Sequence, residues 1–367
     1  MARHFTQAAK FRDFNLSAVT SEHEAFLILT EFAFGHREIF ACPHCGVIGK
    51  HYLRKTRKQF RCRDCDAYFS PTSNTAFHKR KIPCMKLLQA IVMYVTGSNG
   101  EAAGRAAAVL GVDPKTAWLL FSKIREAFVF TWDTRPMEGV VQADGGHFCG
   151  KPHRANRRKK LDSVAVNARL RSRKAAIDPT IKRAHMESWN KEKLKKRRVV
   201  LAIRQVSVEP GSGAVRSTVA ILKQEVAASV FPAVKAAVKP GSRIMTDSGT
   251  AFSPLIAEFD LEMVNHTREY STLDGVNNNQ AESFMSRLRR GEYGVFRGMR
   301  PNYFLDYCIE MCWREDYRRS TIRQRMQDLF KRIRQCGPSP SFAGYFQGTR
   351  RAVEWTTPGR RNSTAPG

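Results

Sequence analysis

Acidic residues and long apolar stretches are both scarce in this chain. Its 367 residues include 33 Asp and Glu against 62 Lys and Arg, a formal net charge of +29. Such a surplus favours a polyanionic partner, usually nucleic acid, over a ribosomal role or membrane-surface binding. No apolar run reaches the roughly 18–20 residues of a membrane span. The start, MARHFTQAAKFRDF, has no apolar signal core. We therefore expect a cytoplasmic protein that does not bind a membrane.

A disulfide framework is not expected either, because the nine cysteines are odd in number and cytosolic thiols stay reduced. Four of them form two Cys-x-x-Cys pairs, separated by the roughly 15–20 residues typical of zinc ribbons. These are Cys42, Cys45, Cys62 and Cys65. Each tight turn presents two thiolates, and two turns complete a tetrahedron around Zn²⁺. We predict a structural zinc ribbon over 39–78 with almost no apolar core, in which His44 and His51 are surface residues and not ligands.

Helical spacing of apolar residues predicts helices over 16–35 and 83–97, the first capped by Ser21 or Thr20. Residues 101–127 show two helical patterns around the turn Gly-Val-Asp-Pro, which resembles a helix-turn-helix whose second helix enters a DNA groove. An ordinary helical hairpin in a core is the alternative. The candidate DNA-facing residues are Lys115, Thr116, Trp118 and Lys123.

From about residue 138 the pattern becomes that of an α/β domain, and acidic residues fall at the ends of predicted strands and at the start of a predicted helix. Asp144 is predicted to close the strand VVQAD, and the glycines after it to leave room for DNA backbone. Asp247 closes RIMTD, and Glu282 begins a helix. Arg289 follows Glu282 by 289 − 282 = 7 positions, about two turns on the same face. Any one such acid is more often a turn former or cap. The ordered set matches what two divalent cations about 3.5–4 Å apart require in phosphodiester chemistry.

Taken together, these pieces resemble the ISXO-like insertion-sequence transposases, over about residues 16–320. The resemblance is carried by CPHC…CRDC, SPTSNTAFHKRKIP, QADGGHFCGK, IMTDSG, NNNQAESFMSRLRRGEYGVFRGM and YFLDYCIEMCWREDYRR. It implies a zinc ribbon before an RNase H-like core, Mg²⁺ dependence, and recognition of inverted repeats at the element's ends. With the helix pair, the expected fold is an α/β, RNase H-like catalytic core preceded by a zinc ribbon and a helix-turn-helix-type domain. We also expect catalytic Mg²⁺ or Mn²⁺, double-stranded DNA as partner at the ends and target, a homodimer or larger assembly because two ends must be joined, and a location at the bacterial nucleoid.

The resemblance has departures and open positions. Asp144-Gly145 stands where Asp-Glu is usual, and Arg289 stands where Lys is usual. The third catalytic residue is Glu282 or Asn279, with Asp274 a weaker alternative, and His266 either positions a water or phosphate or only packs. The expected divisions are a helical segment 1–38, the ribbon 39–78, a helix-turn-helix-type region 79–135, a catalytic domain 136–335 with a basic insertion 151–198, and a flexible tail 336–367.

The function that these expectations favour is a transposase that binds terminal inverted repeats and catalyses metal-dependent DNA cleavage and strand transfer. A catalytically inactive, transposase-derived DNA-binding protein is the main alternative, because it would keep the ribbon and the helix pair without needing Asp144 or Asp247. A metal-dependent nuclease without strand transfer is a weaker one.

Overall fold

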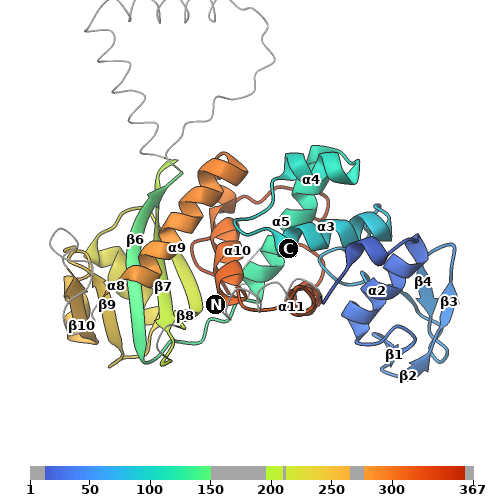
Figure 1. The fold of residues 1–367 in the computed structure, drawn as a ribbon, viewed down its shortest axis with the longest axis horizontal. Coiled ribbons are helices and arrows are strands. Elements are labelled where there is room, and N and C mark those ends of the chain that lie inside the picture. The colour runs from blue at the N-terminus through green and yellow to red at the C-terminus, as the bar shows by residue number, and fades with distance from the viewer. Residues whose placement is uncertain (1–12, 150–195, 210–211, 265–276, 360–367) are drawn as a thin grey trace, which may run out of the picture.

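The computed structural model describes residues 13–149, 196–209, 212–264 and 277–359. Three parts follow one another along the longest axis: a five-stranded sheet, a group of helices, and a small module of short strands (Figure 1). Most of the basic insertion, together with His266 and Asp274, lies outside the described residues. No helix in the described ranges is both long and apolar enough to cross a membrane.

The module of short strands packs against the first long helix. After η1 (Leu16–Ala18), α2 (Glu22–Phe34) begins at Ser21, whose side chain accepts a hydrogen bond from Glu24 N, as predicted for a cap. The strands are β1 (Ile39–Ala41), β2 (Ile48–Lys50), β3 (Tyr52–Arg54), β4 (Gln59–Arg61) and β5 (Tyr68–Phe69). β1 pairs with β2, and β3, β4 and β5 form a second antiparallel sheet.

The expectation of almost no apolar core in this module is wrong. The rings of Phe40, Phe60 and Phe69 are buried against one another, and Phe34 of α2 stacks on Phe40 with ring centroids 4.8 Å apart. His51 also belongs to this core: it is 5% exposed, and its Nε2 lies 3.0 Å from the carbonyl oxygen of Phe40. The placement of His51 at the surface is therefore wrong as well, because its ring packs against Phe40 and Phe69, which come together only in the folded module.

The helical part combines segments from both halves of the chain. It contains α3 (Cys84–Thr96), α4 (Ala103–Leu110), α5 (Pro114–Phe130), α10 (Phe304–Asp316) and α11 (Ile322–Cys336). α3 runs between Pro83 and Gly97 as predicted. Its first backbone N–H groups, at Cys84 and Met85, donate to the carboxylate of Glu22 at 2.6 and 2.8 Å. One apolar core extends from the ribbon and α2 through all these helices to one face of the sheet.

The sheet has the strand order β10-β9-β6-β7-β8. Its strands are β6 (Val140–Phe148), β7 (Arg198–Val206), β8 (Ala214–Leu222), β9 (Arg243–Asp247) and β10 (Asp260–Val264). β6, β7 and β8 are antiparallel, whereas β9 runs parallel to β6 and β10 parallel to β9. β6 does not end at Asp144, contrary to expectation, because residues 145–148 continue to pair with β7.

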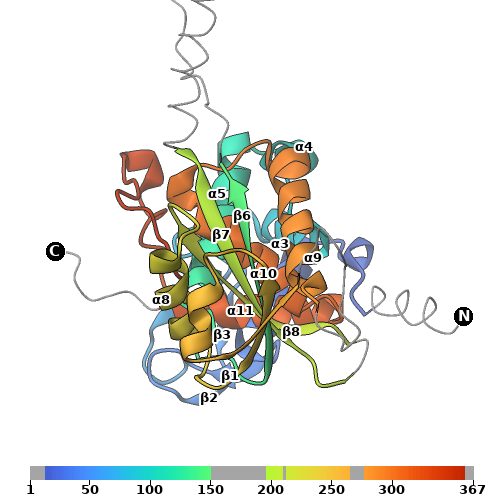
Figure 2. The ribbon, with the colours of Figure 1, turned by 90° about the vertical axis from the view of Figure 1, so that its left-hand side faces the viewer.

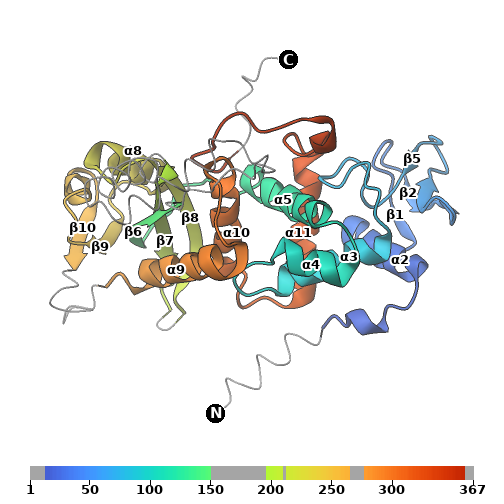
Figure 3. The same cartoon turned by 90° about the horizontal axis from the view of Figure 1, so that it is seen from above.

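Helices cover both faces of this sheet. α8 (Ala227–Ala237) lies on one face and α9 (Asn279–Arg290) on the other, as two perpendicular views show (Figures 2 and 3). Side chains alternate along β7, so that Leu201 packs on the α8 side and Val200 on the α9 side. Pro232 lies inside α8 and does not end it. η2 (Ser253–Ala257) follows β9, and η3 (Gly291–Phe296, a π-helix), η4 (Pro301–Tyr303) and η5 (Tyr345–Gln347) lie near the helical part.

The segment after α11 is packed onto the protein, so the expected flexible tail is wrong for residues 337–359. Arg351 is 7% exposed, and its guanidinium donates to both carboxylate oxygens of Asp306 at 2.5 and 2.8 Å. The carbonyl oxygen of Thr356 accepts from Ile221 N of β8 at 2.7 Å. Composition did not show this order, because the partners are single side chains far back in the sequence. Residues 360–367 lie outside the described part.

Candidate active site and metal centres

The four predicted cysteines converge on one point. Their Sγ atoms all lie within 4.8 Å of one another. The Cys42–Cys65 and Cys45–Cys62 Sγ pairs are 3.8 and 3.6 Å apart. A tetrahedron with Zn–S bonds of about 2.3 Å has edges of about 3.8 Å, so the cluster fits a Zn²⁺ ion with four protein ligands.

Both Cys-x-x-Cys turns have the same local geometry, which explains why the spacing was informative. His44 N and Asp64 N each donate to the preceding cysteine sulfur, Cys42 or Cys62, at 3.4 Å. Although burial opposes it, hydrogen bonds from the backbone of residues 64 and 65 lower the pKa of Cys62 to about 6. The backbone of this turn therefore favours the Cys62 thiolate, which is the form that binds the metal. For Cys45 and Cys65 a backbone hydrogen bond lowers the pKa, but burial and the neighbouring thiols outweigh it and raise the pKa of each.

Asp144 and Asp247 lie side by side. The parallel strands β6 and β9 pair Ala143 with Thr246, and the next residues on the two strands are the two aspartates. Neighbouring strands stand roughly 4.8 Å apart, so both carboxylates leave the sheet at one place. Both residues are half-buried. The sequence prediction that these acids meet is thus supported by the strand register.

α9 places Glu282 and Arg289 near this point. A Cβ at Gly146 would lie 2.8 Å from Met285 Sδ, so the glycine allows α9 to lie close to β6. Glu282 is three residues before Met285 and Arg289 four residues after it, which puts both along the same side of α9. Both are exposed. The guanidinium carbon of Arg289 is 5.7 Å from the ring centroid of Phe148 at the end of β6.

The first turn of α9 is fastened to β6 and β7. The buried amide of Gln142, two residues before Asp144, accepts from Gln280 N at 2.8 Å and donates to Asn277 Oδ1 at 2.9 Å. Arg204 of β7 donates to the carbonyl oxygen of Gln280 at 2.7 Å. Asn279 is exposed at the first helical position. These bonds fix where Asn279 and Glu282 stand relative to Asp144.

The acidic side chains of this site interact electrostatically. Burial, and then the negative charges of Asp247, Glu225 and Glu282, raise the pKa of Asp144 to about 7. Clustered carboxylates of this kind are stabilised by cations, and an all-oxygen ligand set suits Mg²⁺ or Mn²⁺. Within the described ranges, however, only the cysteines form a group of three or more metal-ligand atoms within 4.8 Å. In the acid cluster, formed by Asp144, Asp247, Glu225 and Glu282, no three carboxylates lie within 4.8 Å of one another.

Glu225 was missed by the sequence reasoning. It lies just before α8, and its carboxylate occupies the place that a side chain at Gly145 would fill. Burial and the charge of Asp247 raise the pKa of Glu225. His147 Nε2 lies 3.7 Å from its Oε2. The sequence signal for Glu225 was an acidic residue between β8, the third strand of the sheet, and α8. Such a residue is not a motif by itself. Gly145 and Gly146 thus make room for Glu225 and Met285, and the expectation that they make room for DNA is wrong.

The predicted helix pair exists, but α5 is enclosed. α4 ends at Gly111 in the left-handed region (φ 58°), and Asp113 caps α5 by accepting from Lys115 N. Eleven of the 17 residues of α5 are buried, and α10 and α11 pack against it. Only the start of α5 is accessible, so entry of this helix into a DNA groove is not confirmed and stays a prediction for its N-terminal end. Burial lowers the pKa of Lys123. Lys115 and Thr116, at the exposed start of α5, remain candidates for contact with DNA, and Trp118 lines a cleft there.

Two family models match the chain, and they identify it as a transposase. Residues 136–316 match the ISXO2-like transposase domain, and residues 20–67 match the transposase zinc-ribbon domain. The chain belongs to the ISXO2-like insertion-sequence transposases that carry an N-terminal zinc ribbon. The ribbon match begins before the predicted start at 39 and includes α2, in line with the shared aromatic core. Comparison with curated proteins and with solved structures found no match.

Proposed function

We propose that this chain binds the terminal inverted repeats of its insertion sequence and catalyses metal-dependent DNA cleavage and strand transfer. The observation that carries the proposal is the register of β6 and β9, which sets Asp144 beside Asp247. We also propose an RNase H-like core, which the strand order β10-β9-β6-β7-β8 supports. Family membership supports the transposase class, and the geometry supports these particular acids as its site.

The acids fit divalent cations by donor chemistry and by mutual repulsion. Asp144 and Asp247 would hold Mg²⁺ or Mn²⁺, with Glu282 or Asn279 completing the set from α9 and Glu225 from the start of α8. Bound there, the cations would activate the attacking oxygen and stabilise the leaving one. A cation bound there would favour the ionised form of Asp144, because a neighbouring positive charge lowers the pKa of a carboxyl.

The chain's own groups then position the DNA. Arg289, beyond Glu282 on the same side of α9, donates to a phosphate oxygen. Water attacks the phosphorus at the element's end, the bond to the 3′-oxygen breaks, and a 3′-hydroxyl remains. That hydroxyl then attacks a phosphodiester of the target in line and displaces its 3′-oxygen. Positioning and charge stabilisation are the protein's main contributions.

Double-stranded DNA, an assembly of two or more copies that joins two ends, and a cytoplasmic location at the nucleoid all belong to this proposal. The net charge of +29 supports the first. Binding to DNA should weaken steeply as salt increases, because each phosphate contact releases condensed counterions.

The test is nicking of labelled DNA that carries the element's ends, with Mg²⁺ or Mn²⁺. We expect cleavage by the wild type, and a loss of at least about 100-fold in Asp144→Asn and Asp247→Asn with end binding retained. Asp260→Asn is the matched control, because Asp260 is an exposed acid on β10 of the same sheet. Equal cleavage by wild type and Asp247→Asn would refute the assignment. End binding without cleavage by the wild type would favour the inactive DNA-binding alternative.

A further inference from the structure

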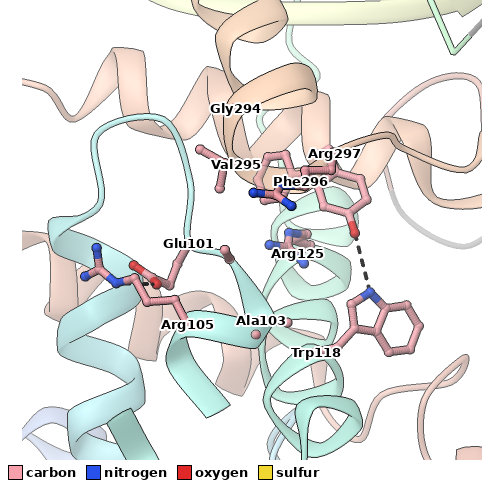
Figure 4. Close-up of a pocket in the computed structure, with 12 residues that line it drawn as sticks. Glu101, Ala103, Arg105, Trp118, Arg125, Gly294, Val295, Phe296 and Arg297 are labelled. Carbon is pink, nitrogen blue, oxygen red and sulfur yellow. Dashed lines mark hydrogen bonds and ion pairs between the residues drawn. The ribbon is translucent and has the colours of Figure 1, made fainter. Parts of the chain in front are cut away.

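A cleft of about 790 Å³ lies between the start of α5 and the segment that follows α9. A second hollow of about 490 Å³ adjoins it and shares Trp118, Phe296 and Tyr307 (Figure 4). Neither contains a member of the acid cluster. Cavities of about 300–1,000 Å³ suit a compact organic group such as a nucleotide.

Aromatic side chains form the walls of this cleft. They are Trp118, Phe296, Tyr303, Tyr307 and Tyr345. The indole N–H of Trp118 points to the hydroxyl of Tyr307 at 3.4 Å (Figure 4). The rings of Phe296 and Tyr307 are 4.6 Å apart, and those of Trp118 and Tyr345 are 5.3 Å apart. All five residues are only partly buried. Arg125 lies over the rings of Phe296 and Tyr307, at 5.3 and 4.4 Å from their centroids, and Arg350 lies 3.7 Å over that of Tyr345. Trp118 is therefore the wall residue best placed to stack on a base.

The backbone holds the Phe296 wall in place. Gly100 has φ 105°, and a Cβ there would overlap the ring of Phe296, so only glycine allows this approach. Phe296 ends the π-helix η3, and Arg297 follows in the left-handed region (φ 52°). π-helices occur frequently at functional sites, and a left-handed conformation is costly for a non-glycine residue.

Positively charged side chains lie at the rim of the cleft. Lys115, Arg297 and Arg300 are exposed, and none of them has an acidic partner among the residues that the structure describes. The acid that reaches the smaller hollow, Glu101, is paired with Arg105 at 3.2 Å (Figure 4). Arg125 is neutralised by Glu310 at 2.5 Å. The rim therefore carries net positive charge over an aromatic interior.

We propose that this cleft binds an unpaired nucleotide of the DNA, with the base against the aromatic walls and the adjoining phosphates at Lys115 and Arg300. The inference rests on the proposed function in taking DNA as the partner. Base faces in a duplex are stacked on one another and cannot enter an aromatic cleft, whereas an extruded or terminal base can. Aromatic faces lined with cations are the usual means of binding such bases.

The cleft and the acid cluster lie along one strip of the protein. From Glu282 to Phe296 the chain is helical over 296 − 282 = 14 steps, which at 1.5 Å each spans about 20 Å. At 3.4 Å per base step this corresponds to about six steps of DNA. A nucleotide held in the cleft would therefore lie on the same DNA segment that meets the acids.

The test measures binding of a 12-nucleotide oligothymidine without divalent cations, by fluorescence anisotropy and by quenching of tryptophan emission. We expect Lys115→Gln combined with Arg300→Gln to weaken oligothymidine binding about tenfold or more, and to weaken binding of a blunt duplex of mixed sequence much less. Trp118→Phe, which keeps the packing of the wall, should remove most of the quenching. Lys331→Gln, an exposed lysine of α11, and Trp355→Phe, a half-buried tryptophan outside the cleft, are the matched controls.

Unchanged oligothymidine affinity in the double variant, or quenching that survives Trp118→Phe, would overturn the proposal. An equal loss for oligothymidine and duplex would overturn it as well, because it would mean a general phosphate-binding surface. Since no divalent cation is present, none of these results depends on cleavage. A failure of the cleft is thereby distinguished from a failure of the acid cluster, which the nicking assay tests.

Discussion

Asp144 combines burial with three negatively charged neighbours, and this makes it a destabilising residue in the cation-free protein. Its pKa of about 7 lies above the value of roughly 3.9 in an unfolded chain. The folded protein then binds a proton more tightly than the unfolded one. Stability from this group is present at low pH and is lost as pH rises from about 4 to about 7.

Asp144→Asn should therefore raise the free energy of unfolding at pH 8 by about 1–2 kcal/mol and change it little at pH 4. Thermal denaturation in EDTA at the two pH values measures this, with Asp260→Asn as the control. Excess Mg²⁺ should stabilise the wild type at pH 8 and leave the variant unchanged. A variant that is less stable than the wild type at pH 8 would contradict the electrostatic account.

Glu225 is expected to contribute to cation binding. Glu225→Gln keeps the size of the side chain and removes its charge, so Mn²⁺ affinity should fall roughly tenfold or more. Isothermal titration at pH 8 measures it, with Glu209→Gln in an exposed loop as the control. If both variants bind Mn²⁺ as the wild type does, Glu225 has no part in the site.

The cysteines were predictable from their fixed spacing, and Asp247 from its place at the end of β9. Asp144 lies beside Asp247 as expected, although β6 continues past it to Phe148, and the catalytic roles of both aspartates stay predictions. It missed Glu225, whose role arises from where α8 starts relative to Gly145. It also placed His51 at the surface, because local sequence does not show that Phe40 and Phe69 pack around its ring.

Local sequence patterns also fail to show the burial of a whole element, helix α5. Its start at Pro114 and the turn before it were readable from local signals. Its burial depends on α10 and α11, which come more than 170 residues later, so no local pattern could reveal it. A buried ion cluster joins α5 to α10: Glu310 accepts from Arg125 at 2.5 Å and from Arg314 at 2.5 and 3.0 Å.

Glu310→Ala should destabilise the protein by about 3–5 kcal/mol, because it leaves two buried guanidinium groups without their counter-ion. Glu310→Gln should cost less, since it keeps an acceptor oxygen. Urea denaturation measures both against Glu209→Ala. A loss below about 1 kcal/mol for Glu310→Ala would mean that the cluster is not a support of the helical core.

At the scale of the molecule, the ribbon and the sheet lie at opposite ends of the helical part (Figure 1). The resemblance predicted both end modules. It did not predict that α10, α11 and residues 337–359 tie the sheet to the helices, because such contacts include isolated pairs such as Arg198 of β7 with Glu354.

Removal of zinc should destabilise the ribbon and leave the sheet at the other end of the molecule intact. Chelation, or Cys42→Ser, should open residues 39–69 to limited proteolysis, because four thiols without the metal no longer hold the two turns together. The sheet should stay resistant, which mass spectrometry of the fragments would show. Cys336→Ser, outside the cluster, is the control. Simultaneous digestion of the sheet would contradict the independence of the two ends.

The proposed function depends most on the binding of divalent cations between β6 and β9. Anomalous diffraction from crystals of the DNA complex grown with Mn²⁺ tests this directly. We predict two peaks about 3.5–4 Å apart, at least one in contact with both Asp144 and Asp247. Mn²⁺ peaks only elsewhere, with neither aspartate as a ligand, would contradict it.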